Sequence, residues 1–354
     1  MSTPRLRKLY SQSGFTLVEL MVALVLGLIL TGGVINIYIS SKQTYRMQDN
    51  QSRLQENGRF ALQFLTKDLR MAGYMGCNTL ATITPNIIAN AAPPPAPIFG
   101  IGTAVQGYDA GAWPSTFPPQ PSNLIPNTSV IVVSYALPSG AFIDQPLPLP
   151  SSAIHVNANP SGWAANTVLF ITDCQVADIF RANSVSASGG GLGGFNINHS
   201  TAANTANVLS KAYGTDAQVM AFSSNMYYLG SMALGTNTTC PCALFRQKFT
   251  SAPPEQLIDN VKNMQINYGV VTNSAPYTVK YVPACPTNAP LCVSTASDWS
   301  SVVSARINLL VTTPDDNLVN KPQSYTFNGG AFTAADQRLY SIFTDTITFR
   351  NRAP

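Results

Sequence analysis

The sequence carries little charge, because only 10% of its 354 residues are Asp, Glu, Lys or Arg, against roughly a quarter in a typical soluble domain. Hydrophobic residues make up 45%, so the chain is not a charge-driven disordered protein. Phosphate contacts need clustered Lys and Arg, and the composition therefore disfavours a nucleic-acid binder. The length exceeds one ordinary core, so we expect one long element with one or two domains.

Histidine is also scarce, and recognisable catalytic motifs are missing. The two histidines, His155 and His199, stand in polar, loop-like sequence without a metal-binding spacing. A G-x-G-x-x-G spacing at residues 189–194 has no strand pattern before it and no helix pattern after it, which predicts a loop and not a nucleotide site. The acidic pair at 315–316 lacks an EF-hand pattern and favours a solvated turn over calcium. We therefore predict no enzyme, no cofactor and no metal.

The formal charge of +4 lies mainly at the two ends of one apolar run. Three basic residues and no acid precede Phe15, and residues 41–70 carry six basic and three acidic residues. From residue 71 onward, eleven basic and twelve acidic residues leave a net charge of −1. The large C-terminal part is therefore nearly neutral.

The apolar run covers residues 15–39, 25 positions in which Glu19 is the one charged residue. About 20 residues are enough to cross a bilayer as a helix. A cleaved secretory signal is the alternative, but the run exceeds the usual h-region of roughly 7–15 residues and no small-x-small cleavage site follows it. The basic residues before the run predict a cytoplasmic N-terminus and an exported remainder.

A second helical pattern continues from the apolar run. Apolar or small residues recur at steps of three and four, at Leu54, Gly58, Leu62, Leu65 and Leu69. Charges are expected on the other face, and Phe60 and Phe64 form a neighbouring stripe. Residues 15–70 then form one helix of about 84 Å that ends near residues 72–73, where Gly73 suits a C-cap.

Glu19 has two interpretations. Burial of an ionised acid in the hydrocarbon layer costs roughly 2.5–3.5 kcal/mol on insertion scales, so such a residue either snorkels to the interface or has a function. The functional interpretation starts from a cut between Gly14 and Phe15, which leaves Glu19 one turn inside a helix whose dipole favours an anion. Its carboxylate could then pair with the new α-ammonium of a neighbouring subunit and fix the axial register.

The N-terminal residues resemble a known family. A short basic leader, the segment Ser13-Gly14-Phe15-Thr16-Leu17-Val18-Glu19-Leu20 and an unbroken apolar helix resemble the class III leader of type IV pilins and pseudopilins. The resemblance implies that Gly14 ends the leader, that Phe15 becomes the N-methylated first residue, and that Glu19 sets the register. It implies the prepilin peptidase, a membrane aspartyl protease, as processing partner.

Three further segments resemble PilW-type minor pilins of the type IV pilus: 54–62, 67–74 and 348–352. The resemblance implies a minor pilin that primes or joins pilus assembly, with other minor and major pilins and the inner-membrane assembly machinery as partners. The expected parts are a leader (1–14), a transmembrane assembly helix (15–39), an amphipathic continuation (40–72) and a periplasmic domain (73–354). The chain is expected to cross the inner membrane once and then enter the pilus, which serves twitching motility.

Two alternatives stay open. The first is a pseudopilin of type II secretion, whose helices are similar, although such chains are usually smaller. The second is a pilus-tip adhesin or DNA-uptake component carried by the loop-rich domain. The near-neutral charge beyond residue 70 disfavours the DNA version.

The exported part is predicted to complete an α+β fold, with a mostly antiparallel sheet packed on the C-terminal half of the helix. Residues 85–150 are rich in proline and predict an irregular stretch broken by one strand. The expected strands are 130–137, 167–172, 219–229, 243–249, 261–271, 302–312 and 340–350.

Six cysteines in an exported chain suggest disulfides. Cys285 and Cys292 flank a short loop and are the first expected pair. The remaining four could pair as Cys77–Cys174 with Cys240–Cys242, or cross over. A redox or soft-metal site at Cys240-Pro241-Cys242 is the lesser alternative, because the spacing is not C-x-x-C.

Overall fold

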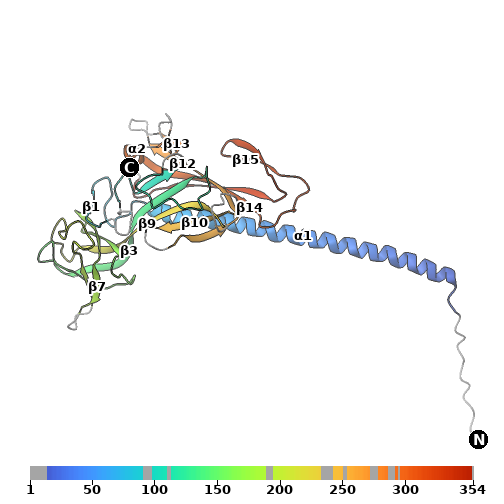
Figure 1. The fold of residues 1–354 in the computed structure, drawn as a ribbon, viewed down its shortest axis with the longest axis horizontal. Helices are drawn as coiled ribbons and strands as arrows, with labels where there is room; N and C mark the ends of the chain where they lie inside the picture. The colour runs from blue at the N-terminus through green and yellow to red at the C-terminus, as the bar shows by residue number, and fades with distance from the viewer. Residues whose placement is uncertain are drawn as a thin grey trace, which may run out of the picture. The chain divides into compact units, whose positions relative to one another are not determined.

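The computed structural model describes residues 14–90, 98–109, 113–188, 194–232, 242–249, 253–271, 278–285, 292–293 and 296–352. The chain divides into two compact units between Ser52 and Arg53. One continuous helix, α1 (Leu17–Met71), includes residues of both units. It is followed by mostly antiparallel sheets, which confirms the predicted α+β class (Figure 1).

In the second unit, α1 supplies a buried apolar stripe. Leu54, Ala61, Leu65 and Leu69 are buried, as the three- and four-residue spacing predicted. Gly58 belongs to this stripe for a steric reason, because a Cβ at this position would lie 2.3 Å from a ring carbon of Phe343. The absent side chain therefore lets the strand that carries this ring approach the helix closely.

The larger sheet has eleven strands among the described residues. They are β1 (Asn86–Ile87), β2 (Val105–Tyr108), β3 (Val130–Gln145), β4 (Ile154–Val156), β5 (Val168–Thr172), β6 (Ala177–Arg181), β7 (Ser184–Ala187), β8 (Phe195–Asn198), β9 (Gln218–Ser231), β10 (Cys242–Lys248) and β11 (Glu255–Asp259). The path runs β1-β6-β5-β9-β3-β4-β8-β7, with β2 on β3, β10 on β9 and β11 on β10. The short β1–β6 pair is parallel, and the other pairs are antiparallel.

A second, four-stranded antiparallel sheet has the order β13-β12-β14-β17. Its strands are β12 (Val261–Val271), β13 (Val279–Pro283), β14 (Val302–Thr312) and β17 (Tyr340–Thr348), and the short helix α2 (Ala296–Ser300) precedes β14. The hairpin β15 (Ser324–Phe327) and β16 (Gly330–Thr333) forms a separate ribbon. The predicted strands 261–271 and 302–312 are confirmed residue for residue.

The main core joins the helix to both sheets. Besides the stripe of α1, it contains buried apolar residues of β3, β9 and β10 in the large sheet and of β12, β14 and β17 in the small one. Representative members are Ile131, Tyr227, Leu244, Ile266, Ile307 and Ile347. Helix α1 is therefore an integral core element of the second unit.

The predicted strand 130–137 was too short. Strand β3 continues to Gln145, and its register against β9 shifts between Leu137 and Ala141. This irregularity accommodates Pro138 and places Gly140 at a φ of +72°, a conformation that glycine adopts easily. The irregular stretch predicted for 85–150 also contains β1 and β2, whereas the other predicted strands end within two residues of the observed ones.

The expectation that charges fill only the outer face of the helix is wrong for Asp68. Its side chain is buried, and its Oδ2 accepts hydrogen bonds from the Tyr227 hydroxyl at 2.6 Å and from the Asn225 amide at 2.7 Å. Burial, reinforced by the neighbouring Asp68 carboxylate, raises the pKa of Tyr227. The acid thus ties α1 to β9 through two buried donors.

We expect Asp68→Ala to destabilise the exported domain by about 3 kcal/mol, because two buried donors lose their acceptor. Asp68→Asn is the matched control, since it keeps the shape and one acceptor oxygen and should cost less. Urea unfolding of the full chain in detergent, followed by tryptophan fluorescence, measures both values. Equal stability of the Ala variant and the wild type would show that the network adds nothing.

The C-terminal segment closes the end of α1. The helix ends at Met71, close to the predicted C-cap, and Gly73 adopts a φ of +74°. The Asn351 amide donates to the Ala72 carbonyl at 3.3 Å, and the buried Arg352 guanidinium donates to the carbonyls of Ile101 and Trp299. Burial lowers the pKa of Arg352 to about 10. The terminal polar residues therefore have a structural role next to the helix end.

Candidate processing and assembly site

The first turn of α1 begins with a capping box. Thr16 lies just before the helix, and its hydroxyl accepts a hydrogen bond from the Glu19 amide at 3.2 Å. In return, the Glu19 carboxylate accepts the amide and the hydroxyl of Thr16, each at 3.1 Å. This reciprocal pattern satisfies backbone donors that a helix start leaves open. It fixes the start of the helix at Leu17.

Sequence reasoning assigned no role to Thr16, although the spacing T-x-x-E before an apolar run is the signature of a capping box. Both bonds to the carboxylate end on Oε2 of Glu19, and within the described part of the chain no hydrogen bond reaches Oε1. The acid therefore caps its own helix and retains an oxygen for a second donor.

The two residues at the expected cut lie before the helix. Gly14 and Phe15 are outside any helix or strand, and the Phe15 side chain is 89% exposed. A Cβ at Gly14 would meet no atom within 4 Å, so the fold itself does not require glycine there. Both residues that flank the expected cut are therefore exposed within the described part of the chain.

The apolar run is exposed among the described residues. Its large apolar side chains, from Phe15 to Ile39, are 47–89% exposed. An 18-residue window in this helix reaches a mean hydropathy of 2.4 with none of it buried, so the helix is long and apolar enough to cross a membrane. Exposure of this much apolar surface requires a lipid or protein environment.

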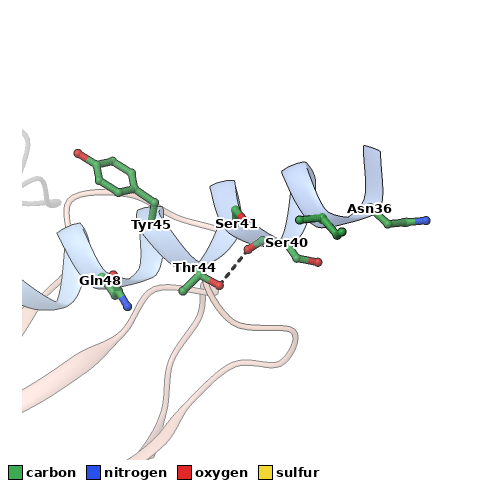
Figure 2. A pocket seen from close by; sticks show the side chains of 7 residues that line it. Asn36, Ser40, Ser41, Thr44, Tyr45 and Gln48 are labelled. Carbon is green, nitrogen blue, oxygen red and sulfur yellow. Dashed lines mark hydrogen bonds between the residues drawn. The ribbon is translucent and has the colours of Figure 1, made fainter. Parts of the chain in front are cut away.

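Uncharged polar residues dominate the stretch that follows the apolar run. Figure 2 shows Asn36, Ser40, Ser41, Thr44, Tyr45 and Gln48 around a shallow depression on α1. The Thr44 hydroxyl donates to the Ser40 carbonyl at 2.9 Å, and the Asn36 amide donates to the Gly32 carbonyl at 3.0 Å. Side-chain bonds to the helix's own carbonyls satisfy polar groups locally, which suits a segment at the edge of an apolar layer.

The cysteines are joined within the second unit. Disulfides connect Cys77 to Cys174 and Cys285 to Cys292. Cys242 is also disulfide-bonded, whereas Cys240 lies outside the described residues. The Cys77–Cys174 bond spans 97 residues of sequence and attaches the segment after α1 to the β5–β6 turn. Cross-links of this kind are typical of proteins outside the reducing cytosol.

The predicted loop position is wrong for His155 but confirmed for His199. His155 lies in β4, where its Nδ1 contacts the Asp144 carboxylate. His199 follows β8 outside any strand, and its Nε2 donates to the Ser152 carbonyl at 2.9 Å. Both residues are buried. Burial lowers the pKa of His199.

No group of three or more His, Cys, Asp or Glu suited to a metal occurs among the described residues. Much of the glycine-rich segment 189–194 lies outside that part of the chain.

Asp109 is a half-buried acid that follows β2, and its carboxylate oxygen Oδ2 is buried. The Ser129 hydroxyl donates to its carboxylate, and the Ser129 Oγ accepts the Ile266 amide of β12 at 2.9 Å. Burial raises the pKa of Asp109 from 3.8 to about 6, although the hydrogen bond from Ser129 opposes this shift. The folded domain therefore binds a proton here more strongly than the unfolded chain.

We expect this acid to make the domain less stable as pH rises. Between about pH 4 and pH 6 the carboxyl is ionised in the unfolded chain but protonated in the fold, so stability falls by at most about 3 kcal/mol and is then level. Asp109→Asn should remove that slope. Urea midpoints at pH 4.5 and pH 7.5 test this expectation, and an equal slope in the variant would assign the pH dependence to other groups.

Two family models match the chain. The model of the prokaryotic N-terminal methylation motif matches residues 9–35, and that of type IV pilus-assembly protein W matches residues 226–351. The chain is type IV pilin-like, of the PilW type. Comparison with curated proteins and with solved structures finds no match. Both families consist of structural pilus-assembly components and not of enzymes, which gives this PilW-type chain a role in pilus assembly.

The matches coincide with distinct structural features of the PilW-type chain. The methylation motif covers the capping box and most of the exposed apolar run. The assembly-protein model covers the end of β9, strands β10 to β17 and helix α2, which include the whole four-stranded sheet. The matched models and the apolar helix together indicate a membrane-anchored component that meets the peptidase and the pilus machinery.

Proposed function

We propose that this chain is a minor pilin that primes or joins type IV pilus assembly after cleavage between Gly14 and Phe15. One observation carries the proposal: the capping box starts the helix at Leu17 and leaves the Gly14–Phe15 bond exposed just before an uncovered apolar segment. A protease needs an extended, accessible peptide, and the exposed helix behind it then needs neighbours of its own kind. The prepilin peptidase is the proposed processing enzyme, and Phe15 is the proposed site of N-methylation.

Glu19 has a second task in this proposal. Cleavage creates an α-ammonium at Phe15, four residues from an acid whose Oε2 already accepts the bonds from Thr16. In a bundle of parallel helices, the ammonium of an adjacent subunit can reach the carboxylate, and each charge then offsets the burial cost of the other. Because such a pair forms at one axial offset, it sets the register between the subunits.

The proposed topology has a cytoplasmic leader, one span of the inner membrane and a periplasmic domain. Three basic residues before Phe15 favour retention of that end in the cytoplasm. The disulfides Cys77–Cys174 and Cys285–Cys292 agree with an oxidising compartment for the domain. Other minor pilins, the major pilin and the inner-membrane assembly machinery are the proposed partners.

A deletion strain tests the function and separates it from the alternatives. A minor pilin predicts a loss of surface pili and twitching, with restoration by the wild-type chain and normal protein secretion. A secretion defect with normal pili would instead assign the chain to type II secretion. Normal pili with a loss of surface attachment or DNA uptake would favour the tip adhesin or the DNA-uptake component.

A further inference from the structure

The exposed side of α1 in the second unit is unusual for a solvated helix face. Phe60 and Phe64 lie one turn apart on it, and each side chain is 37% exposed. The buried stripe of Leu54, Leu65 and Leu69 lies on the opposite side of the helix. These two rings therefore do not contribute to the main core of the domain and project from its surface.

Basic side chains flank the two rings on one side. Arg59, Lys67 and Arg70 are exposed on the same side of the helix, where Glu56 is the one exposed acid between Leu54 and Met71. Within the described part of the chain, none of these three basic side chains takes part in an ion pair or a side-chain hydrogen bond. The nearby acid Asp68 is buried and bonded to Tyr227 and Asn225, so it faces away from them.

We propose that the outer face of α1, formed by Arg59, Phe60, Phe64, Lys67 and Arg70, docks an acidic helix of a different pilin-like subunit. Two apolar rings at i and i+4 present a ridge that fits a groove on another helix. The flanking positive charge selects a partner with Asp or Glu beside its apolar stripe. This inference rests on the proposed function as a minor pilin and specifies the chemistry of the partner.

Charge also argues against a second copy as the occupant. Two copies that met through this face would bring Arg59, Lys67 and Arg70 against the same three cations, and like charges in contact oppose association. The surface therefore fits a heterologous neighbour, which agrees with a subunit present in few copies.

A photo-crosslinking amino acid at Gln63, which is exposed on the basic flank beside Phe60, tests the proposal in cells that express the full chain. The expected adduct joins Gln63 to the N-terminal helix of another subunit with a class III leader, at a position flanked by Asp or Glu. The double variant Lys67→Glu with Arg70→Glu should lower the adduct yield about tenfold, and Phe60→Ala with Phe64→Ala should lower it similarly.

The matched control is the double variant Lys280→Glu with Lys321→Glu, which changes two other exposed lysines and should leave the adduct yield unchanged. Protease resistance and intact disulfides show that each variant folds. An adduct to a second copy, to phospholipid or to nucleic acid would overturn the proposal, and so would an equal loss in the control. Absence of an adduct in a strain that needs the chain for piliation overturns the docking face alone, whereas normal piliation in the deletion strain overturns the proposed function.

Discussion

Gly14→Val should leave the leader attached to nearly all of the chain. Gly14 and Phe15 are exposed, and a Cβ at Gly14 would meet no described atom within 4 Å, so the fold itself does not select glycine at this position. In the proposed function, the requirement for glycine therefore comes from the peptidase, whose active site has to approach the peptide closely. Misplacement of a scissile bond by about 1 Å costs roughly a hundredfold in rate. Intact-mass measurement of the membrane-anchored protein reads the processed fraction directly.

Gly33→Ala is the matched control for that experiment. A Cβ at Gly33 would likewise meet no atom within 4 Å, yet this residue lies inside α1 and away from the cut. Alanine there should stabilise the helix by about 1 kcal/mol relative to glycine and should leave cleavage unchanged. A Gly14→Val chain of mature mass would refute the assigned cut, and a cleavage defect in both variants would point to helix bending instead.

Glu19→Ala should be cleaved nearly normally but should reduce surface pili by at least about tenfold. The substitution removes the acid that we propose for the neighbour's ammonium, while the exposed Gly14–Phe15 bond is unchanged. It also removes half of the capping box, which costs the helix start about 1 kcal/mol. Immunoblots of the mature chain and counts of pili per cell measure the two effects separately.

Thr16→Ala distinguishes the two tasks of the acid. It breaks the capping box from the other side, because the Thr16 hydroxyl is the acceptor for the Glu19 amide, but it keeps the carboxylate. If Glu19 acts between subunits, Thr16→Ala retains pili and Glu19→Ala loses them. Equal loss in both variants would reduce the role of Glu19 to helix capping, and normal piliation in both would remove it from assembly.

The sequence was most informative where local patterns determine structure. The apolar run and the three- and four-residue spacing predicted α1, and strands 261–271 and 302–312 were predicted with their ends. Alternating side chains and turn residues mark such elements locally. The division into two sheets was not predictable, because it depends on pairings between distant strands such as β3 with β9.

Buried polar residues were the main errors, since composition and periodicity do not show which polar side chains find partners. Asp68 looked like a surface charge, but Tyr227 and Asn225 satisfy it from strand β9, about 160 residues later in the sequence. His155 looked like a loop residue, but it is buried opposite Asp144. Thr16 was the exception, because its capping signal was present in the sequence itself.

The central claim is that this chain is cut after Gly14 and assembles as a pilin. The most direct test is mass spectrometry of its N-terminal peptide, both from sheared pili and from assembly complexes isolated from the inner membrane. We expect a peptide that begins with N-methylated Phe15, in few copies relative to the major pilin. A chain that retains its leader in these assemblies, or that begins at another residue, would contradict the claim.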